Sequence, residues 1–344
     1  MTHRSDMDDS GNDWTEDVLG AGFEARTLRL PGRSGALRVP AAHRRRPAVD
    51  GGSEATLVRY TPEDRPDVGR PPVLYVHGYT DYFFQRHVAE AIAGRGYPFY
   101  AIDLRGYGRS MEAWMATGAD ANMVNSLRLY QQDLDAAAEA IAADGHSGLV
   151  LMGHSMGGLI TSMYAHARPE QVTALVLNSP WFDLRGSWSD RTLVTQLVYL
   201  LGRIAPRTVL AHLDEDYGRA LHRATGGEWD YDLRWKPYAG FPVRAGWLAS
   251  IRRGHRRLAR GLTVRCPTLL CTSDATGPDG GAAAVMLSTD AILDVAHMHA
   301  RAPQVGAAVD VAVIEGGAHD LALSPKQARE KYLTTVLDWL DAKA

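Results

Sequence analysis

Short apolar runs alternate with stretches of helical periodicity along most of the chain. Residues 55–60 predict a short strand, and buried strands are predicted at 72–76, 98–102, 149–152, 172–177, 267–271 and 309–314. Between these runs, apolar residues recur at helical spacing, as at Leu127, Tyr130 and Leu134. Apolar strands that alternate with helices predict an α/β fold, in which helices cover both faces of a mostly parallel central sheet.

The alternation is interrupted between residues 183 and 262, a stretch rich in Trp, Tyr and Arg that shows no buried-strand pattern. One predicted helix in this stretch has two unlike faces, formed by Trp247, Ile251, His255 and Leu258 on one side and by Arg252, Arg253, Arg256, Arg257 and Arg260 on the other. Because strands flank the stretch on both sides, we expect an inserted helical cap at 183–262. The core is then predicted at 21–182 and 263–344, after a flexible tail at 1–20.

The composition changes this picture little. The chain has 344 residues, 45% of them hydrophobic and 22% charged, which excludes collagen-like, coiled-coil and disordered proteins. A length of this size fits two domains or one large α/β domain with an insertion. The formal net charge of -3 argues against a dedicated nucleic-acid binder, which would carry a strongly basic domain.

The predicted environment is a reducing one inside the cell. Cys266 and Cys271 are five positions apart on a predicted strand and are poorly placed to form a disulfide. No apolar run is long enough to span a membrane, and the acidic N-terminus does not resemble a signal peptide. We therefore expect a cytoplasmic protein without an integral membrane segment. The sequence leaves open whether it forms a homo-oligomer.

A candidate nucleophile lies in the sequence Gly153-His154-Ser155-Met156-Gly157-Gly158, which contains the pattern G-x-S-x-G. The pattern lies between the predicted strand 149–152 and a helical stretch, which is the context it requires. In such a sharp turn the glycines avoid side-chain clashes and the serine hydroxyl stands at the start of the helix. The alternative is a glycine-rich turn with an incidental serine.

A serine hydroxyl needs a histidine to take its proton, and the histidine needs a carboxylate to orient it. In this kind of fold the order along the chain is serine, acid, histidine. His319 fits because it follows the predicted strand 309–314 through a glycine-containing loop. The other histidines lie too early in the chain, in the predicted cap or on a predicted helix, and the alternative for His319 is a loop histidine without a role.

Four aspartates between the last two predicted strands are candidates for the acid. Asp274 follows the strand most closely, but residues 274–287 form a glycine-rich excursion, and Asp290 to Asp294 lead directly into a helix. We therefore rank Asp290 first, Asp294 second and Asp274 third, and expect Asp279 to lie in a turn. Asp290 and Asp294 could instead order a loop or cap a helix.

Ester or amide hydrolysis through a serine places negative charge on the former carbonyl oxygen, which backbone N–H groups must stabilise. Met156, the residue after the nucleophile, is expected to supply one of them. The second is expected from the loop at 77–81, with the backbone of Tyr79 as the donor.

Together these motifs resemble the α/β-hydrolase superfamily, in the branch of monoacylglycerol lipases, lysophospholipases and serine aminopeptidases. The resemblance covers roughly residues 55–182 and 263–341 and rests on four motifs: His77-Gly78, DLRGYGRS at 103–110, GHSMGG at 153–158 and Gly317-Ala318-His319. Family members carry the triad acid in a short aspartate-plus-apolar signature, which Asp290-Ala291-Ile292-Leu293-Asp294 resembles. The long excursion before that signature departs from the family pattern.

The resemblance implies hydrolysis of a carboxylic ester through an acyl-enzyme, without a metal or an organic cofactor. Ser155 would attack, His319 would act as base and then as acid, and Asp290 would orient His319. The expected partner is a small-molecule ester, which could be lipid-like, aromatic or a lactone.

Trp181 and Phe182 are predicted to line the substrate pocket because they leave the sheet at its carboxyl end, whereas most aromatic residues of the predicted cap are expected to hold it onto the core. An amide or peptide hydrolase is the alternative enzyme. It would need an anchor for a substrate ammonium, such as Asp214, Glu215 or Asp216. A non-catalytic binding protein on the same fold is the remaining alternative.

Overall fold

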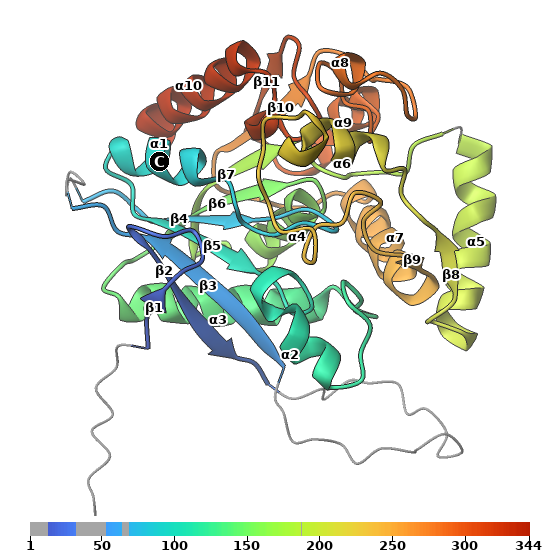
Figure 1. Cartoon of the computed structure of the whole chain (residues 1–344), viewed down its shortest axis with the longest axis horizontal. Helices are drawn as coiled ribbons and strands as arrows, with labels where there is room; N and C mark the ends of the chain where they lie inside the picture. The colour runs from blue at the N-terminus through green and yellow to red at the C-terminus, as the bar shows by residue number, and fades with distance from the viewer. Residues whose placement is uncertain (1–12, 32–52, 64–68, 187) are drawn as a thin grey trace, which may run out of the picture.

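The computed structural model describes residues 13–31, 53–63, 69–186 and 188–344 (Figure 1). Within these ranges a nine-stranded sheet has the order β1-β2-β3-β5-β4-β6-β7-β10-β11. The strands from β5 to β11 in that order are parallel, and β1, β2 and β3 extend the sheet in antiparallel fashion. The bounds are Thr15–Glu16 (β1), Phe23–Arg29 (β2), Glu54–Tyr60 (β3), Val73–Val76 (β4), Phe99–Asp103 (β5), Leu149–His154 (β6), Val172–Asn178 (β7), Thr268–Ser273 (β10) and Val309–Ile314 (β11).

Helices cover both faces of this sheet, as the apolar pattern predicted. Successive strand residues point to opposite faces, so Leu74 and Val76 pack in one hydrophobic cluster while Val73 and Tyr75 pack in another. The first cluster includes side chains of α3 (Arg128–Ala143) and α4 (Met156–Ala167), and the second includes those of α1 (Arg86–Gly94) and α10 (Lys326–Lys343). The α/β prediction is confirmed.

The last predicted strand lies in a different environment from the one expected. Residues 309–314 form β11, but Val311 and Val313 are exposed because β11 is the edge strand of the sheet. Short helices complete the core: α2 (Met111–Ala116), α8 (Ala283–Met286) and α9 (Val295–Arg301). No helix in the described ranges is both long and apolar enough to cross a lipid bilayer.

The predicted tail at 1–20 extends too far into the chain. Residues 1–12 lie outside the described residues, as does the predicted loop at 40–52. From residue 14 the chain is part of the fold: Trp14 is buried beneath the Arg59 guanidinium, β1 pairs with β2, and Asp17 forms an ion pair with Arg109. Single buried anchors in a polar segment produce no periodic pattern, which is why the sequence suggested a tail.

The chain between β7 and β10 leaves the sheet and contains α5 (Trp188–Ile204), β8 (Val209–Ala211), α6 (Asp216–Leu221), β9 (Val243–Arg244) and α7 (Ala245–Ala259). We call residues 183–262 the inserted segment. In Figure 1, α5 and α7 lie side by side at the edge of the molecule, and β8 and β9 form a small antiparallel ribbon that the sequence did not predict. On α7, Trp247, Ile251, His255 and Leu258 are buried, whereas Arg253, Arg256 and Arg257 are exposed.

Candidate active site

Ser155 lies in a tight turn between β6 and α4. Its backbone has φ 52° and ψ −115°, a conformation that residues with a side chain rarely adopt. The turn passes very close to its neighbours: a Cβ at Gly157 would lie 2.2 Å from the Val76 carbonyl oxygen, and one at Gly153 would lie 2.6 Å from the Gly157 oxygen. The two glycines are therefore required by packing, and the strained turn presents the Ser155 hydroxyl at the start of α4.

Three predicted side chains come together at this turn. The Ser155 Oγ lies 3.1 Å from His319 Nε2, and His319 Nδ1 lies 3.0 and 3.1 Å from the two carboxylate oxygens of Asp290. Because an ionised carboxylate can only accept hydrogen bonds, the network assigns the imidazole proton to Nδ1 and leaves Nε2 to accept from the serine hydroxyl.

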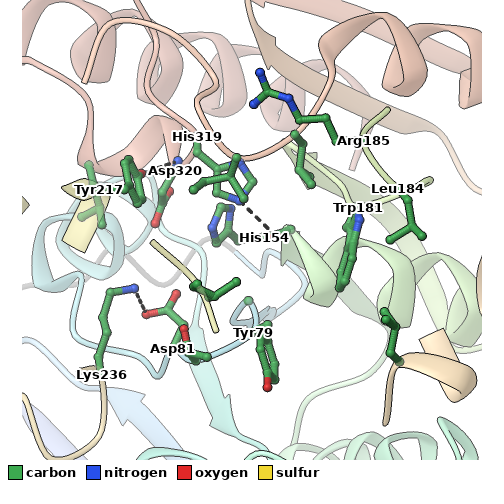
Figure 2. Close-up of a pocket in the computed structure, with 18 of the residues that line it drawn as sticks. Tyr79, Asp81, His154, Trp181, Leu184, Arg185, Tyr217, Lys236, His319 and Asp320 are labelled. Carbon is green, nitrogen blue, oxygen red and sulfur yellow. Dashed lines mark hydrogen bonds and ion pairs between the residues drawn. The ribbon is translucent and has the colours of Figure 1, made fainter. Parts of the chain in front are cut away.

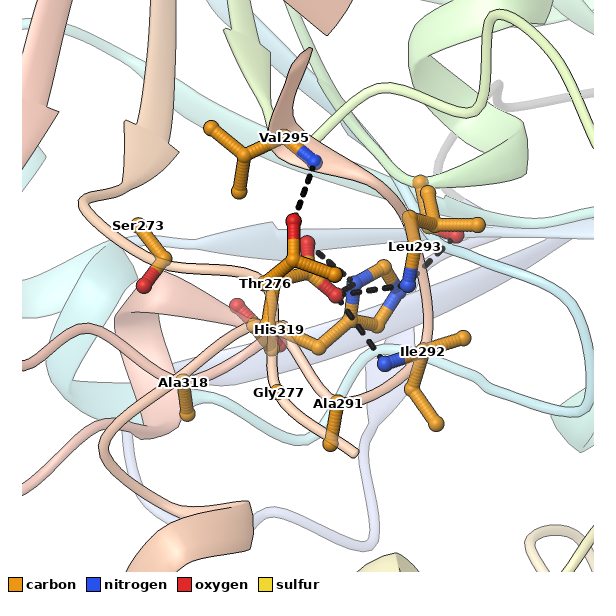
Figure 3. A network of polar contacts seen from close by, with 12 residues as sticks. Ser273, Thr276, Gly277, Ala291, Ile292, Leu293, Val295, Ala318 and His319 are labelled. Carbon is orange, nitrogen blue, oxygen red and sulfur yellow. Dashed lines mark hydrogen bonds and ion pairs between the residues drawn. The ribbon is translucent and has the colours of Figure 1, made fainter. Parts of the chain in front are cut away.

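The Asp290 carboxylate is fully buried and is itself held in place by the backbone. One of its oxygens accepts the N–H groups of Ile292 and Leu293, at 3.1 and 2.7 Å, and Figure 3 shows both beside His319. Hydrogen bonds of this kind stabilise the charged carboxylate where water cannot reach it. The side chain that faces His319 therefore has a fixed orientation.

The other aspartates of this region have different partners. Asp274 accepts a backbone N–H, Asp279 forms an ion pair with an arginine, and Asp294 caps the start of α9. Of the four candidates from the sequence, Asp290 is the one that contacts His319.

The two residues expected to stabilise an oxyanion flank Ser155. Met156 is the first residue of α4, and the first N–H groups of a helix have no partner within the helix. The loop that carries Tyr79 passes next to the turn, since a Cβ on Gly78 would lie 3.2 Å from the Ser155 Cβ. The Tyr79 ring stacks on Trp247 of the inserted segment, with ring centroids 3.8 Å apart.

A cavity of about 450 Å³ opens above Ser155 (Figure 2). Much of its wall is apolar and comes from both the core and the inserted segment: Tyr79, Trp181, Leu184, Val194, Leu213, Leu248, Ile292, Leu293 and Leu323. Of the two residues expected at a substrate pocket, Trp181 lines this cavity and Phe182 does not. The Phe182 ring is instead 1% exposed and packs in the hydrophobic core, so burial of its apolar surface takes it away from the cavity.

One end of the cavity is polar. The Lys236 ammonium lies 2.6 Å from the buried Asp81 carboxylate, and Figure 2 shows the pair at the cavity wall. Burial alone would raise the pKa of Asp81, but the charge and hydrogen bond of Lys236, together with the charges of His154 and His77, outweigh it, and the pKa lies below its usual range. The second oxygen of Asp81 has no hydrogen-bond partner among the described residues and is available to another donor.

Asp81, His154 and Asp320 are the three residues in the described ranges whose ligand atoms are grouped closely enough to hold a metal ion. Their surroundings fit a metal poorly. Lys236 already neutralises Asp81, and the oxygens of Asp320 accept N–H groups from Asn178 and Gln85.

Sequence reasoning missed Lys236 and Tyr217, both in the inserted segment. The Tyr217 hydroxyl accepts the backbone N–H of Asp320 at 3.0 Å, and its ring lies edge-on to His319. A weak signal for Lys236 exists: the chain has four lysines among its 37 basic residues, and the other three lie in the last 19 positions. Nothing in the local pattern of the segment indicates that either side chain reaches the cavity.

The parallel sheet, the strained serine turn and the late histidine loop define the class of this protein, which is an α/β-hydrolase. The chain belongs to the serine aminopeptidase family S33 (Hydrolase_4), whose family model matches residues 69–325.

Known relatives and solved structures are similar to this chain over different lengths. It is 30% identical over 169 residues to the monoacylglycerol lipase of Mycolicibacterium smegmatis. The aligned stretch covers 48% of this chain and 56% of that protein. It is 35% identical over 125 residues to the lipase LipV of Mycobacterium tuberculosis, 35% of this chain and 41% of that one. The matches therefore span about half the length of these curated relatives or less.

The solved structures agree on the fold. The monoacylglycerol lipase of Paleococcus ferrophilus superposes with a TM-score of 0.60 at 21% identity, covering 80% of this chain and 97% of that one. A monoglyceride lipase variant from Saccharomyces cerevisiae gives a TM-score of 0.63 at 16% identity, covering 85% and 92%.

Proposed function

We propose that this protein hydrolyses carboxylic esters through an acyl-enzyme, with Ser155 as nucleophile, His319 as general base and Asp290 as the orienting acid. The observation that carries the proposal is the hydrogen-bonded chain from Ser155 Oγ through His319 to the buried Asp290, at the floor of a cavity. Relatives that are lipases support an ester rather than another acyl substrate.

The geometry suits each step of this reaction. His319 Nε2 takes the proton as Ser155 Oγ attacks the ester carbonyl carbon, and the N–H groups of Met156 and Tyr79 stabilise the oxyanion. When the C–O bond to the alcohol breaks, His319 returns the proton to the leaving oxygen. A water molecule then attacks the acyl-enzyme by the same route, and Ser155 is regenerated. Asp290 holds the imidazole tautomer throughout and stabilises its charged form.

The cavity supports a lipid-like ester with one apolar and one polar side. Its aliphatic and aromatic wall suits an acyl chain, while the free oxygen of Asp81 and the ammonium of Lys236 suit a hydroxyl-bearing alcohol. A monoacylglycerol has this distribution of polarity. In this proposal the inserted segment at 183–262 acts as the cap, because Val194, Leu213 and Leu248 form part of the apolar wall.

Peptide hydrolysis has less support. An aminopeptidase needs a carboxylate for the substrate ammonium, but the predicted anchors Asp214, Glu215 and Asp216 do not line the cavity over Ser155. The buried carboxylate that does line it, Asp81, is already paired with Lys236. Both observations favour the ester.

Hydrolysis of p-nitrophenyl esters of increasing chain length and of a monoacylglycerol tests the proposal. Wild type is compared with Ser155→Ala and with Ser126→Ala, the same change at a loop serine away from the cavity. Turnover that disappears in Ser155→Ala alone supports the proposal, as does labelling of Ser155 by a fluorophosphonate. The proposal is wrong if folded wild type hydrolyses none of these esters, or if Ser155→Ala remains active.

A further inference from the structure

A row of four aromatic rings runs past Ser155, from the loop expected to hold the oxyanion to a buried histidine. Tyr79 stacks on Trp247, Trp247 lies 5.7 Å from Trp181 between ring centroids, and Trp181 meets the His255 ring edge-on at 5.3 Å. Trp247 and His255 both belong to α7 and are eight residues apart on its buried face, about 12 Å along the axis. One rigid helix therefore contacts the chain on both sides of the nucleophile.

The backbone of Trp181 links this helix to the serine turn. The Trp181 N–H donates to the Ser155 carbonyl oxygen at 2.9 Å, and the Trp181 carbonyl oxygen lies 2.9 Å from His255 Nε2. The peptide group before the Trp181 Cα is thus held by Ser155, and the peptide group after it is held by His255 of α7.

Arg252 determines which nitrogen of the His255 imidazole carries the proton. Its guanidinium lies 2.9 Å from His255 Nδ1 and can only donate, so the imidazole proton is on Nε2, where it donates to the Trp181 carbonyl. The same guanidinium pairs with Asp183 at 2.7 Å and donates to Thr195 of α5 at 2.9 Å. Asp183 also pairs with Arg301, so the segment that follows Trp181 is held by two arginines.

His255 has no place in the chemistry of the reaction itself. It does not line the cavity, and burial together with the neighbouring Arg252 lowers its pKa to about 3. It remains a neutral hydrogen-bond donor at neutral pH, which is the property that a purely structural link to a backbone carbonyl requires.

We propose that His255, oriented by Arg252, is a positioning residue. It fixes the Trp181 backbone against α7, the helix that also holds Tyr79. Through Trp181 it fixes the strained Ser155 turn. This inference rests on the proposed function. Ser155 has a positive φ that its own residue type does not favour, so its conformation depends on contacts from outside the turn. Its carbonyl accepts from both Gly158 and Trp181, and His255 anchors the second of these donors.

Two substitutions separate positioning from packing. His255→Gln keeps a donor for the Trp181 carbonyl and an acceptor for Arg252, whereas His255→Leu fills a similar volume and keeps neither. We expect His255→Leu to lower kcat on a short-chain ester about tenfold, with KM changed less than twofold, and to slow fluorophosphonate labelling of Ser155 equally. His255→Gln should recover most of the lost kcat.

Thermal unfolding of both variants shows whether they fold. Arg252→Met is a second, independent test of the inference, since it removes the group that sets the His255 tautomer. Loss of kcat in His255→Leu and Arg252→Met with recovery in His255→Gln supports the inference. Wild-type kcat in His255→Leu, an equal loss in His255→Gln, or an effect on KM alone overturns it. Failure of the proposed function is distinct, because wild type would then hydrolyse no ester or would not need Ser155.

Discussion

The two halves of the cavity wall are built in different ways. On the sheet side, the serine turn leads into α4, where Leu159 and Ile160 are buried and glycines pack directly against neighbouring backbone. On the other side, α5 of the inserted segment contributes Val194 to the cavity but exposes Leu197 and Leu200 by more than half of their surface. The helix behind the first half is therefore buried against the sheet, whereas the helix behind the second half leaves apolar side chains exposed.

This difference separates chemistry from recognition. The groups proposed to react lie beyond the carboxyl ends of parallel strands. Ser155 and His319 follow β6 and β11 closely, and Asp290 ends the longer excursion after β10. The inserted segment supplies walls, two charged side chains (Arg185 and Lys236) and the links from α7. We therefore expect changes on the sheet side to reduce the rate strongly, and changes in the inserted segment to alter selectivity, positioning or stability by smaller amounts.

The largest effect is expected at the buried acid. Asp290→Asn keeps the shape of the side chain but cannot fix the Nδ1–H tautomer of His319 or stabilise its charge. We expect kcat on a p-nitrophenyl ester to fall about 1,000- to 10,000-fold. Steady-state kinetics on protein whose circular dichroism matches wild type measure this.

Asp294→Asn and Asp274→Asn are the matched controls, since both aspartates were candidates from the sequence. Each asparagine keeps an amide oxygen that can accept the same backbone N–H, and we expect less than a tenfold change in kcat. A larger loss at either position than at Asp290 would contradict the assignment of the acid.

The second prediction contrasts two neighbouring residues. Phe182→Ala removes a ring from the core and should lower the free energy of unfolding by about 3–5 kcal/mol. Trp181→Ala enlarges the cavity and should shift the preferred acyl-chain length with a smaller effect on stability. Denaturant unfolding and a chain-length series measure both properties, and an unchanged chain-length profile in Trp181→Ala would show that this ring does not shape the acyl site.

The sheet side could be predicted from the sequence because its signals are local. A glycine-flanked serine between a strand and a helix, and a histidine after the last strand, each depend on a few neighbouring residues. The acid was harder to assign, since four aspartates share its region and their partners come from distant positions, and the family signature strengthened a ranking made from the local pattern. Asp290 was ranked first among them, and it is the one that lies against His319.

The inserted segment could not be predicted in the same way. His255 and Trp247 were correctly placed on one helix face, yet nothing in the sequence indicates that this face meets Trp181 and Tyr79. Lys236 lies outside any helix or strand and reaches Asp81 across 155 residues of sequence. Such contacts depend on how the segment packs on the core, which periodicity does not report.

The third prediction concerns pH and the buried histidine of α7. The pKa of His255 is lowered to about 3 in the folded protein, whereas an unfolded histidine titrates near 6.5. Between these values the unfolded chain binds a proton that the folded chain does not, so stability falls as the pH decreases. The contribution of His255 to this change in the free energy of unfolding approaches about 1.4 kcal/mol per pH unit.

Urea unfolding at pH 7, 6 and 5 tests this, because most carboxylates remain ionised over that range. His255→Gln should show a shallower loss of stability than wild type on going from pH 7 to 5. His212→Gln, at an exposed position of the inserted segment, should keep the wild-type slope. Equal slopes in all three proteins would mean that His255 becomes protonated in the folded state.

The smallest effect is expected on the outer face of α5. Leu197→Ala and Leu200→Ala remove side chains that are 56% and 57% exposed, so each should change the free energy of unfolding by no more than about 0.5 kcal/mol. The same substitution at the buried Leu159 of α4 should cost about 2–5 kcal/mol. If the α5 variants lose as much stability as Leu159→Ala, this face is covered in solution. A loss that grows with protein concentration would then identify the cover as a second copy of the chain, because only an association between copies depends on concentration.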